Sequence, residues 1–403
     1  MATKLDSYQY LNSRRFLCAL IVLGLTSSTS GTVSPVLLAT YVQNVGLTER
    51  AAGLVISAEA AGYAAAQLIF FFALYRWSAL RSALLGLALV LGANLLTIAS
   101  TSGPELAGVR FLAGIGMGVI WSLVVSTVAH RRNAQRDYSI FTAVSLTYAA
   151  SLFGVAPWIG SKYGIAGLMA FVLSLGVFGL AGAIDLRHYG GGASPRNHPV
   201  ESSAPAGLDW GTARLAVTCL LLYAGHNALW SYQQRVGLSV GLTPTVVGSL
   251  LGLSVLAGAA GAAIASVTGS RLGFSRPQWI AYAMLIAAAV LFTRPGTAGT
   301  FISAAILVKV GWFYGYPLLQ GALAARDPSG RAPVLASFLQ TVGATVGPGS
   351  AALVVGRGYA YVGGVGLLYY LISLPLVMGV LRKMDREVVH GPESAARTCA
   401  RPN

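Results

Sequence analysis

The chain has little charge for its length. Only 10% of its 403 residues are Asp, Glu, Lys or Arg, while 55% are hydrophobic. Soluble domains usually carry about 25% charged residues, so this composition excludes an ordinary soluble fold. The charge that is present is one-sided, with 27 Lys and Arg against 12 Asp and Glu. A nucleic-acid binder would need those basic residues on a solvated face, and the chain has too little polar sequence to form one.

Cysteine is also scarce, and its placement excludes two kinds of site. The three cysteines, Cys18, Cys219 and Cys399, are odd in number and far apart, which fits neither a disulfide framework nor a zinc site. The sequence contains no nucleophile constellation, metal cluster or phosphate-binding loop. We therefore expect no enzyme, no cofactor and no metal. A polar lead over residues 1–15 followed by a long apolar run also does not match a cleavable signal peptide.

Apolar sequence and glycine are abundant instead. The mean hydropathy is +0.67 and there are 49 glycines, a combination typical of polytopic helical membrane proteins. A membrane-spanning helix needs about 20 apolar residues. The apolar runs predict twelve spans, at residues 16–41, 51–74, 80–99, 105–129, 138–160, 165–185, 212–234, 245–269, 278–292, 299–325, 334–355 and 360–381.

These spans divide into two sets of six. We predict an N-terminal six-helix bundle over residues 1–185 and a C-terminal one over 212–381, with a cytoplasmic tail at 382–403. Residues 186–211 contain a Gly-Gly-Gly run and Ser-Pro, and this composition is typical of a flexible linker. The loops on one side hold most of the Lys and Arg, which predicts that this side and both termini are cytoplasmic. We expect a multi-pass protein of the cytoplasmic (inner) membrane.

The two halves resemble each other. Gly46-Leu47-Thr48 recurs as Gly241-Leu242-Thr243, and the same register places Gly53 on Gly248 and Ile69 on Ile264. Both triplets precede the second span of their half, so the loop positions agree as well as the residues. Parallel six-span halves are one architecture expected of secondary transporters, with the substrate site between the halves near the membrane midplane.

The motifs also carry a resemblance to a known family. The loop after the second span keeps Arg76 and Arg81, although Phe71 and Tyr75 replace the Gly and Asp of the family signature, and the equivalent loop around Arg271 keeps more of it. The fourth span has an Arg followed by spaced glycines, and the eleventh has an antiporter-type glycine-proline motif. The chain thus resembles the major facilitator superfamily over nearly its whole length. The residues concerned are Arg110, Gly114, Gly116, Gly118, Gly343, Gly347 and Pro348.

This resemblance implies an all-α membrane protein with two pseudo-symmetric bundles of six helices that work by alternating access. It implies gating or conformational roles for Arg76, Arg271, Gly347 and Pro348. Glycine and proline positions can equally be static packing devices, and both interpretations stay open here.

Four ionisable residues lie inside expected spans, namely Glu59, Arg110, His226 and Lys309. Such residues are costly in a membrane and are functional hypotheses by default. Arg110 and Lys309 hold similar places in the fourth and tenth spans, and the resemblance implies that these spans line a central cavity. We expect both cations to face a substrate. Arg110 could instead have a structural or coupling role, and His226 could simply bond a neighbouring helix.

Aromatic and polar residues follow the helical period near these cations. Lys309 shares one face with Trp312 or Phe313, Tyr316 and Gln320, because their offsets match the turns of a helix. The seventh span has a similar stripe, and the fourth adds Trp121. Two cations beside aromatic walls suit a small organic anion, in particular an aromatic carboxylate. The alternative is that these aromatic rings only pack the helices together and do not bind a ligand. The stripe in the seventh span is Tyr223, His226, Trp230 and Gln233.

Glu59 is the only carboxylate well inside an expected span. It is our candidate for proton coupling, with a fixed Glu59–Arg110 ion pair that braces the N-terminal half as the alternative. The sequence therefore predicts a proton-coupled transporter of a small organic anion. Its expected partners are the substrate, protons and the lipid bilayer, and its expected oligomeric state is a monomer.

Two other functions stay open. A proton-driven drug or metabolite efflux antiporter is favoured by the Arg110 signature and the glycine-proline motif, but the first span lacks an acidic residue. A non-transporting membrane receptor would usually need a signalling appendage, and the tails are short.

Overall fold

The structure is a computed structural model of the chain, and it describes residues 9–72, 77–129, 131–132, 134–188, 209–268, 272–294, 296–326 and 331–399. Within these ranges nearly every residue is helical and no strand occurs. The prediction of an all-α membrane fold is confirmed. Most of the predicted linker, together with residues 1–8 and 400–403, lies outside the described residues, whereas residues 382–399 of the predicted tail continue the last helix.

The N-terminal half consists of α2 (Arg14–Thr32), α3 (Ser34–Asn44), α4 (Glu49–Phe72), α5 (Ala79–Ala99), α6 (Gly103–Ala129) and α7 (Ala134–Asp185). The helices α2 and α3 meet at a bend of 47° and together occupy the first expected span. Gly164 has a φ of +63° inside α7, a left-handed conformation that glycine adopts without steric cost. This kink divides α7 into the expected fifth and sixth spans.

The C-terminal half consists of α8 (Trp210–Ser239), α9 (Pro244–Thr268), α10 (Ser275–Thr293), α11 (Ala298–Arg326), α12 (Arg331–Val354) and α13 (Tyr359–Cys399). Nine described helices are long and apolar enough to cross a membrane, or ten with the bent pair. The long α7 counts as one of these nine helices although it contains two expected spans. The helix α8 is not among the nine, because polar residues such as His226 and Gln233 lower its mean hydropathy. The described helices therefore occupy all twelve expected positions.

The internal repeat has the same local structure in both halves. Gly46 and Gly241 both have positive φ, at 75° and 85°. The Thr48 hydroxyl accepts a hydrogen bond from the backbone N–H of Ala51, and Thr243 does the same for Val246. Threonine at this position caps the first turn of a helix. The repeated Gly-Leu-Thr thus ends one span and begins the next in each half.

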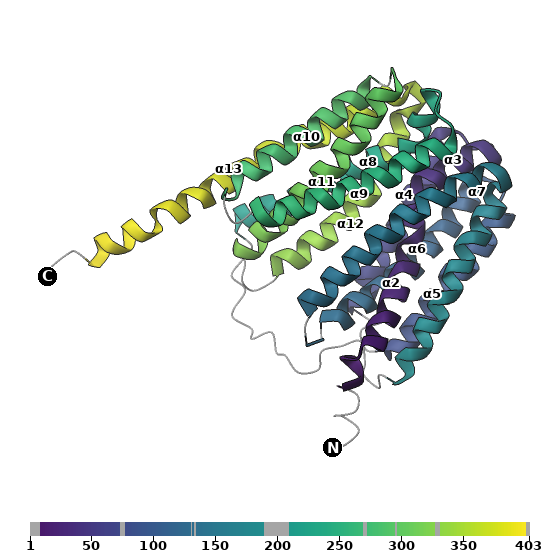
Figure 1. Cartoon of the computed structure of the whole chain (residues 1–403), viewed down its shortest axis with the longest axis horizontal. Helices are drawn as coiled ribbons and strands as arrows, with labels where there is room; N and C mark the ends of the chain where they lie inside the picture. Colours follow the sequence, from purple (N-terminus) through teal and green to yellow (C-terminus); the bar gives the residue numbers. More distant parts are fainter. Residues whose placement is uncertain are drawn as a thin grey trace.

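The two bundles contact each other mainly along three helix pairs, α4 with α12, α7 with α9 and α3 with α8. The Ser57 hydroxyl donates to the Thr345 carbonyl at 2.7 Å, and the Thr341 hydroxyl donates to Gln67 at 2.8 Å. The helices of the two bundles converge around α3 and diverge toward the chain ends (Figure 1). We call the end with the chain termini the terminus end and the opposite end the distal end.

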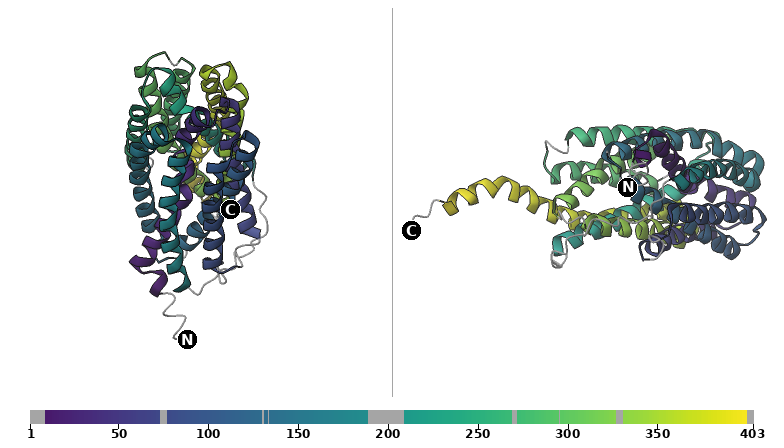
Figure 2. Two further views of the ribbon diagram at one scale, coloured as in Figure 1. Left: turned by 90° about the vertical axis from the view of Figure 1, so that its right-hand side faces the viewer. Right: turned by 90° about the horizontal axis from the view of Figure 1, so that it is seen from below.

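At the terminus end, two sets of bonds each lie within one bundle. The Arg131 guanidinium pairs with Asp137 at 2.6 Å in the N-terminal half. Asp385 of α13 accepts from the backbone N–H groups of Phe274 and Ser275 at the start of α10, at 2.7 and 3.0 Å. Beyond this contact α13 projects from the helical body (Figure 2). Each bundle is therefore braced separately at the terminus end.

Asp209 at the start of α8 gives a testable contribution to stability. Its carboxylate accepts from the backbone N–H of Thr212 at 3.1 Å and pairs with Arg326. These bonds, the Arg326 bond first, lower the pKa of Asp209. Because the folded-state pKa is depressed, this stabilisation is present above the ordinary carboxyl pKa and is lost as the pH falls below it.

We expect Asp209→Asn to lower the melting temperature by about 1–2 °C at neutral pH, since the side chain is half exposed and such pairs contribute little. The difference from wild type should shrink below about pH 4. Glu387→Gln, which removes an exposed carboxylate on α13, is the control. A difference that is constant with pH would contradict the assignment to the Asp209 charge.

Candidate functional site

A buried cation lies between α8 and α11. The Lys309 Nζ atom is 3.3 Å from Nε2 of His226 and 3.3 Å from the ring centroid of Trp230. All three side chains are buried. The imidazole lone pair and the face of the indole ring both attract an ammonium group. They hold Lys309 in place, but they supply no negative charge.

Aromatic rings extend this cluster along the same two helices. The His226 ring stacks on Trp312 at a centroid distance of 4.3 Å, and Trp312 stacks on Tyr316 at 4.9 Å. Tyr223 meets Trp312 edge-on at 4.7 Å, and the Gln320 amide donates to the Tyr316 hydroxyl. The two stripes predicted for the seventh and tenth spans therefore face each other. We call these residues with Lys309 and Trp230 the α8–α11 cluster.

Two predicted residues lie elsewhere. Phe313, the alternative to Trp312 at this helical offset, packs against Gly258 of α9. Trp121 of α6 lies 5.6 Å from the ring of Phe141 of α7, inside the N-terminal bundle. The helical period did not separate Trp312 from Phe313 because offsets of three and four both fit one face.

Exposure within the cluster changes along the helix axes. Lys309, Trp230, His226 and Trp312 are buried, whereas Tyr223, Tyr316 and Gln320 are half-buried. The half-buried residues lie toward the terminus end, where α8 begins and α11 ends. A ligand that approaches from the terminus end would therefore meet the hydroxyl and amide groups first and the ammonium group last.

The charge of Lys309 is unmatched within the part of the chain that the structure describes. No described carboxylate forms an ion pair with it, in contrast to the ion pairs of Arg110, Arg131 and Arg235. His226 Nδ1 and both amide atoms of Gln233 are buried and have no hydrogen-bond partner there. Buried polar groups usually have partners, so this region is chemically incomplete without a further anionic or polar group.

Arg110 forms a second buried site, and its charge is fully matched. Its Nε atom donates to Glu59 Oε2 at 2.6 Å, and Nη2 also pairs with that oxygen. Nη1 donates to the Asn94 amide oxygen at 2.7 Å, and Nη2 donates to the Ser30 hydroxyl. The guanidinium is fully buried. This network links α2, α4, α5 and α6 through a single side chain.

Asn94 was not predicted to be part of this site. It is the only Asn or Gln in the third expected span, and a lone amide in an otherwise apolar membrane helix was the signal that could have found it. The glycines that follow Arg110 allow α6 to approach α4 closely enough for Arg110 to bond Glu59. Gly114 lies against the backbone carbonyl of Glu59, and Gly118 lies against that of Tyr63. Side chains at these positions would force α4 and α6 apart.

The predicted gating residues divide into two groups. Arg76 and Arg271 lie outside the described residues. Gly347 of α12 lies against the backbone of Ala224 in α8, and Gly343 one turn away lies against Leu220. Pro348 lies inside α12 directly after this contact. The glycine-proline motif thus brings the backbones of α8 and α12 close together beside the α8–α11 cluster.

The close contact at Gly347 predicts a loss of stability on substitution. A Cβ atom at this position would lie within 2.9 Å of the Ala228 backbone nitrogen, so Gly347→Ala should destabilise the protein by about 1–3 kcal/mol. Gly154→Ala in α7 is the matched control, because no heavy atom lies within 4 Å of its new Cβ. Thermal unfolding in detergent measures both. Equal melting temperatures for the two variants would contradict the packing role.

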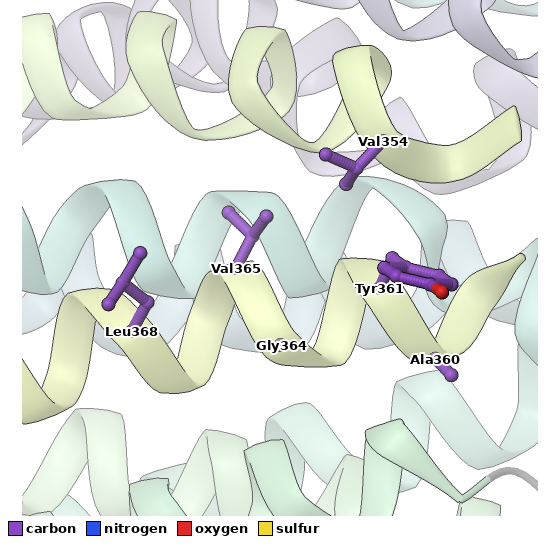
Figure 3. A pocket seen from close by; sticks show the side chains of 6 residues that line it. All are labelled: Val354, Ala360, Tyr361, Gly364, Val365 and Leu368. Carbon is purple, nitrogen blue, oxygen red and sulfur yellow. The ribbon is translucent and has the colours of Figure 1, made fainter. Parts of the chain in front are cut away.

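A separate hollow lies between the end of α12 and the start of α13 at the distal end (Figure 3). It is lined by Val354, Ala360, Tyr361, Gly364, Val365 and Leu368. None of these six residues is charged, so this hollow lacks the chemistry of the α8–α11 cluster.

Comparisons with known proteins agree with this architecture. A family model described as Major Facilitator Superfamily matches residues 17–351. The solved structure of the nucleoside transporter NupG has a TM-score of 0.72 at 14% sequence identity, and the match covers 92% of this chain and 99% of that one. A mutant of the peptide transporter POT in complex with alafosfalin has a TM-score of 0.71 at 15% identity, covering 94% and 99%. No curated protein sequence matches the chain. At such identities the structural likeness concerns the fold alone.

Proposed function

Because the chain belongs to the major facilitator superfamily, we propose that it is a proton-coupled secondary transporter of a small organic anion, such as an aromatic carboxylate. That it is a membrane transporter and not an enzyme follows from the family and from the transporter folds that it matches. The organic anion as substrate and the coupling of its transport to protons go beyond the family and are proposed here. We also propose that the monomer operates in the inner membrane with both termini in the cytoplasm.

The unmatched charge of Lys309 is the observation that carries the substrate class. Among the described residues this buried ammonium has a ring and an imidazole beside it but no carboxylate. A carboxylate on the substrate would supply the missing charge as a charge-assisted hydrogen bond. A lipophilic cation would add a second positive charge in a low-dielectric site, which is strongly unfavourable.

The stacked rings support an aromatic substrate. The ring centroids of Tyr223, Trp312 and Tyr316 lie within 6 Å of one another, so a substrate ring at this cluster would meet an aromatic surface. An aromatic group contributes offset stacking in addition to the apolar area that it buries. Gln320 and Tyr316 at the more exposed end can bond a polar substituent of the substrate.

Proton coupling is proposed for Glu59 through its bond to Arg110. When Glu59 is ionised, it neutralises Arg110 and the pair is electrically silent. Protonation of Glu59 would leave the Arg110 charge available to a substrate anion. The proton and the anion would then be bound together, and their joint binding would add no net charge to the carrier before the bundles reorient.

The test is transport by purified protein in liposomes with an imposed pH difference. Benzoate and phenylacetate are compared with acetate, the neutral analogue benzamide and a lipophilic cation. We expect the protein to accelerate the accumulation of benzoate-type anions on the alkaline side above the rate in protein-free liposomes, and benzamide to equilibrate without accumulation. Extrusion of the cation without faster accumulation of any anion than in protein-free liposomes would overturn the proposal.

One observation favours an antiporter as the second candidate. Gly343 and Gly347 hold α12 against α8, and they belong to the glycine-proline motif that the family associates with antiport. The direction of proton movement separates the two functions, because a symporter carries the substrate and the proton in the same direction. Alkalinisation of the side from which substrate leaves, measured with a pH-sensitive dye, supports symport.

A further inference from the structure

The hollow between α12 and α13 faces away from the helical body. The helix α13 packs chiefly against α8 and α10. Its Gly363 lies against the backbone of Phe292 in α10, and its Gly366 lies against Leu229 of α8. The residues of α13 that line the hollow are on the other face of the helix, because they are offset from these glycines by about half a turn. Since the chain is a membrane protein, this outward face meets lipid.

The shape and lining of the hollow suit an alkyl chain. It has a volume of about 320 Å³ and lies between Val354 of α12 and the side chains of Tyr361 and Leu368 on α13 (Figure 3). Gly364 leaves this space open, since no heavy atom lies within 4 Å of a Cβ atom added there. Beyond Leu368 the exposed Ile372 continues the same apolar face one turn further along α13.

A cation stands at the distal end of this apolar groove. Arg357 is the last residue of η3 (Val355–Arg357), three residues after Val354 and three before Ala360. One apolar span ends at Arg357 and the next begins at Tyr359, which places Arg357 at the membrane boundary. Its side chain is exposed. Within the part of the chain that the structure describes, Arg357 belongs to no ion pair.

A carboxylate at the same end is already matched by other partners. Glu49 at the start of α4 accepts from Nε of Arg235 and from the hydroxyl of Tyr359, both at 2.6 Å. Tyr359 shares the packed face of α13 with Gly363, because the two are four residues apart. The charge of Glu49 is therefore balanced by Arg235 on the side of α13 away from the hollow, and the charge of Arg357 remains available.

We propose that this hollow binds one acyl chain of an anionic phospholipid whose phosphate pairs with Arg357. A guanidinium group forms charge-assisted and often bidentate hydrogen bonds with phosphate. Lipid tails are as apolar as the side chains of a membrane helix, so the chain gains no hydrophobic burial here. It fills a hollow whose lining would otherwise lack contacts on one side. The hollow fixes the position of the chain, and Arg357 supplies the preference for an anionic headgroup.

A second copy of the protein suits this face less well than a lipid does. A two-fold contact buries the same patch on both copies, and copies in one membrane have the same orientation. The two Arg357 side chains would then meet at the same end of the contact and repel each other. A lipid phosphate brings the opposite charge to the same place.

Site-directed readout of lipid contact tests the proposal. The purified chain in micelles of an uncharged detergent is mixed with phosphatidylglycerol that carries a diazirine in one acyl chain, irradiated, and mapped by peptide mass spectrometry. Labelling of residues 354–368 is compared with labelling at Val177 and Phe178, which are exposed apolar residues of α7 and report ordinary lipid contact. Unlabelled phosphatidylglycerol, phosphatidylcholine and water-soluble glycerol phosphate serve as competitors. No transported substrate is present, so the result is independent of the proposed transport function.

We expect phosphatidylglycerol to suppress labelling of the hollow at about one tenth of the concentration that phosphatidylcholine requires, an effect of about 1.4 kcal/mol. Arg357→Gln should abolish this preference. Arg294→Gln removes another exposed cation, at the end of α10, and should retain it. Gly364→Leu fills the hollow and should lower its labelling to the level of α7. Gly154→Leu is the matched control, since its position in α7 is equally open.

Several results would overturn the proposal. Two concern the headgroup, namely equal competition by the two lipids in the wild type and a preference that persists in Arg357→Gln. Unchanged labelling in Gly364→Leu would exclude the hollow as the chain site. Competition by glycerol phosphate as strong as that by phosphatidylglycerol would indicate a free phosphate, and crosslinks between two copies in place of lipid labelling would indicate a dimer. If Gly364→Leu does not fold, Arg357→Gln decides, because it changes only an exposed side chain.

Discussion

Lys309→Ala should weaken binding of the transported anion by about 100-fold. The variant removes the only charge in the α8–α11 cluster, and loss of one partner of a buried charge pair costs about 2–5 kcal/mol. The rings of Trp312 and Tyr316 would remain, so residual binding should be insensitive to the charge of the ligand. Benzoate and benzamide should then bind the variant equally, whereas the wild type should prefer benzoate.

The same substitution should not destabilise the empty protein. Lys309 is a buried cation without a carboxylate partner among the described residues, and such a group is unfavourable in a membrane helix. Its removal should leave the melting temperature unchanged or raise it. Functional sites often carry instability of this kind. A structural lysine would behave in the opposite way, with lower stability and unchanged ligand preference.

Titration calorimetry and thermal unfolding measure the two effects on one preparation. Lys309→Arg retains the charge and should keep the preference for benzoate, with affinity reduced by the change of shape. Lys162→Ala removes an exposed lysine near Trp158 and Tyr163 and should bind as wild type does. Wild-type affinity for benzoate in Lys309→Ala would contradict the role assigned to this residue.

The sequence predicted the helices well because a membrane imposes simple requirements. Twenty apolar residues between polar boundaries define a span, and the described helices lie at all twelve expected positions. The kink at Gly164 lies between two predicted spans. The bend between α2 and α3 lies inside the first predicted span and coincides with Pro35 at the start of α3, a residue that lacks the backbone N–H needed to continue the preceding helix.

The candidate sites were predicted in part. Periodicity placed Lys309 and His226 on facing stripes, since a helix of known direction fixes which residues share a face. It could not predict that Arg110 would bond Asn94 and Ser30 at once, because that requires the rotation of three helices about their axes. Glu49 was missed for a different reason. Glu49 lies just before the second expected span, at the end of a loop. Its ion pair with Arg235 forms only where the two bundles pack together, which the sequence alone does not reveal.

Glu59→Gln should abolish accumulation driven by a pH difference and preserve exchange of labelled for unlabelled anion. Exchange needs binding and reorientation of the loaded carrier but no net proton movement. The glutamine cannot take up or release a proton, so a pH gradient can no longer drive substrate through this site. Glu59→Asp retains a titratable group and should keep part of the coupling.

The alternative role of Glu59, as a fixed brace for Arg110, predicts a different pattern. Removal of one partner of a buried ion pair costs about 3–5 kcal/mol, because the other charge stays buried without a partner. Glu59→Gln should therefore lower the melting temperature under either role. The double variant Glu59→Gln/Arg110→Gln removes both charges, and the non-additive part of its stability measures the pair directly.

Transport by the double variant separates the two roles. If the pair is only a brace, the double variant should recover both stability and pH-driven accumulation, because neither charge was needed for transport. If Glu59 carries the proton, the double variant should recover stability and remain uncoupled. Accumulation at the wild-type level in either glutamine variant would exclude Glu59 as the proton carrier.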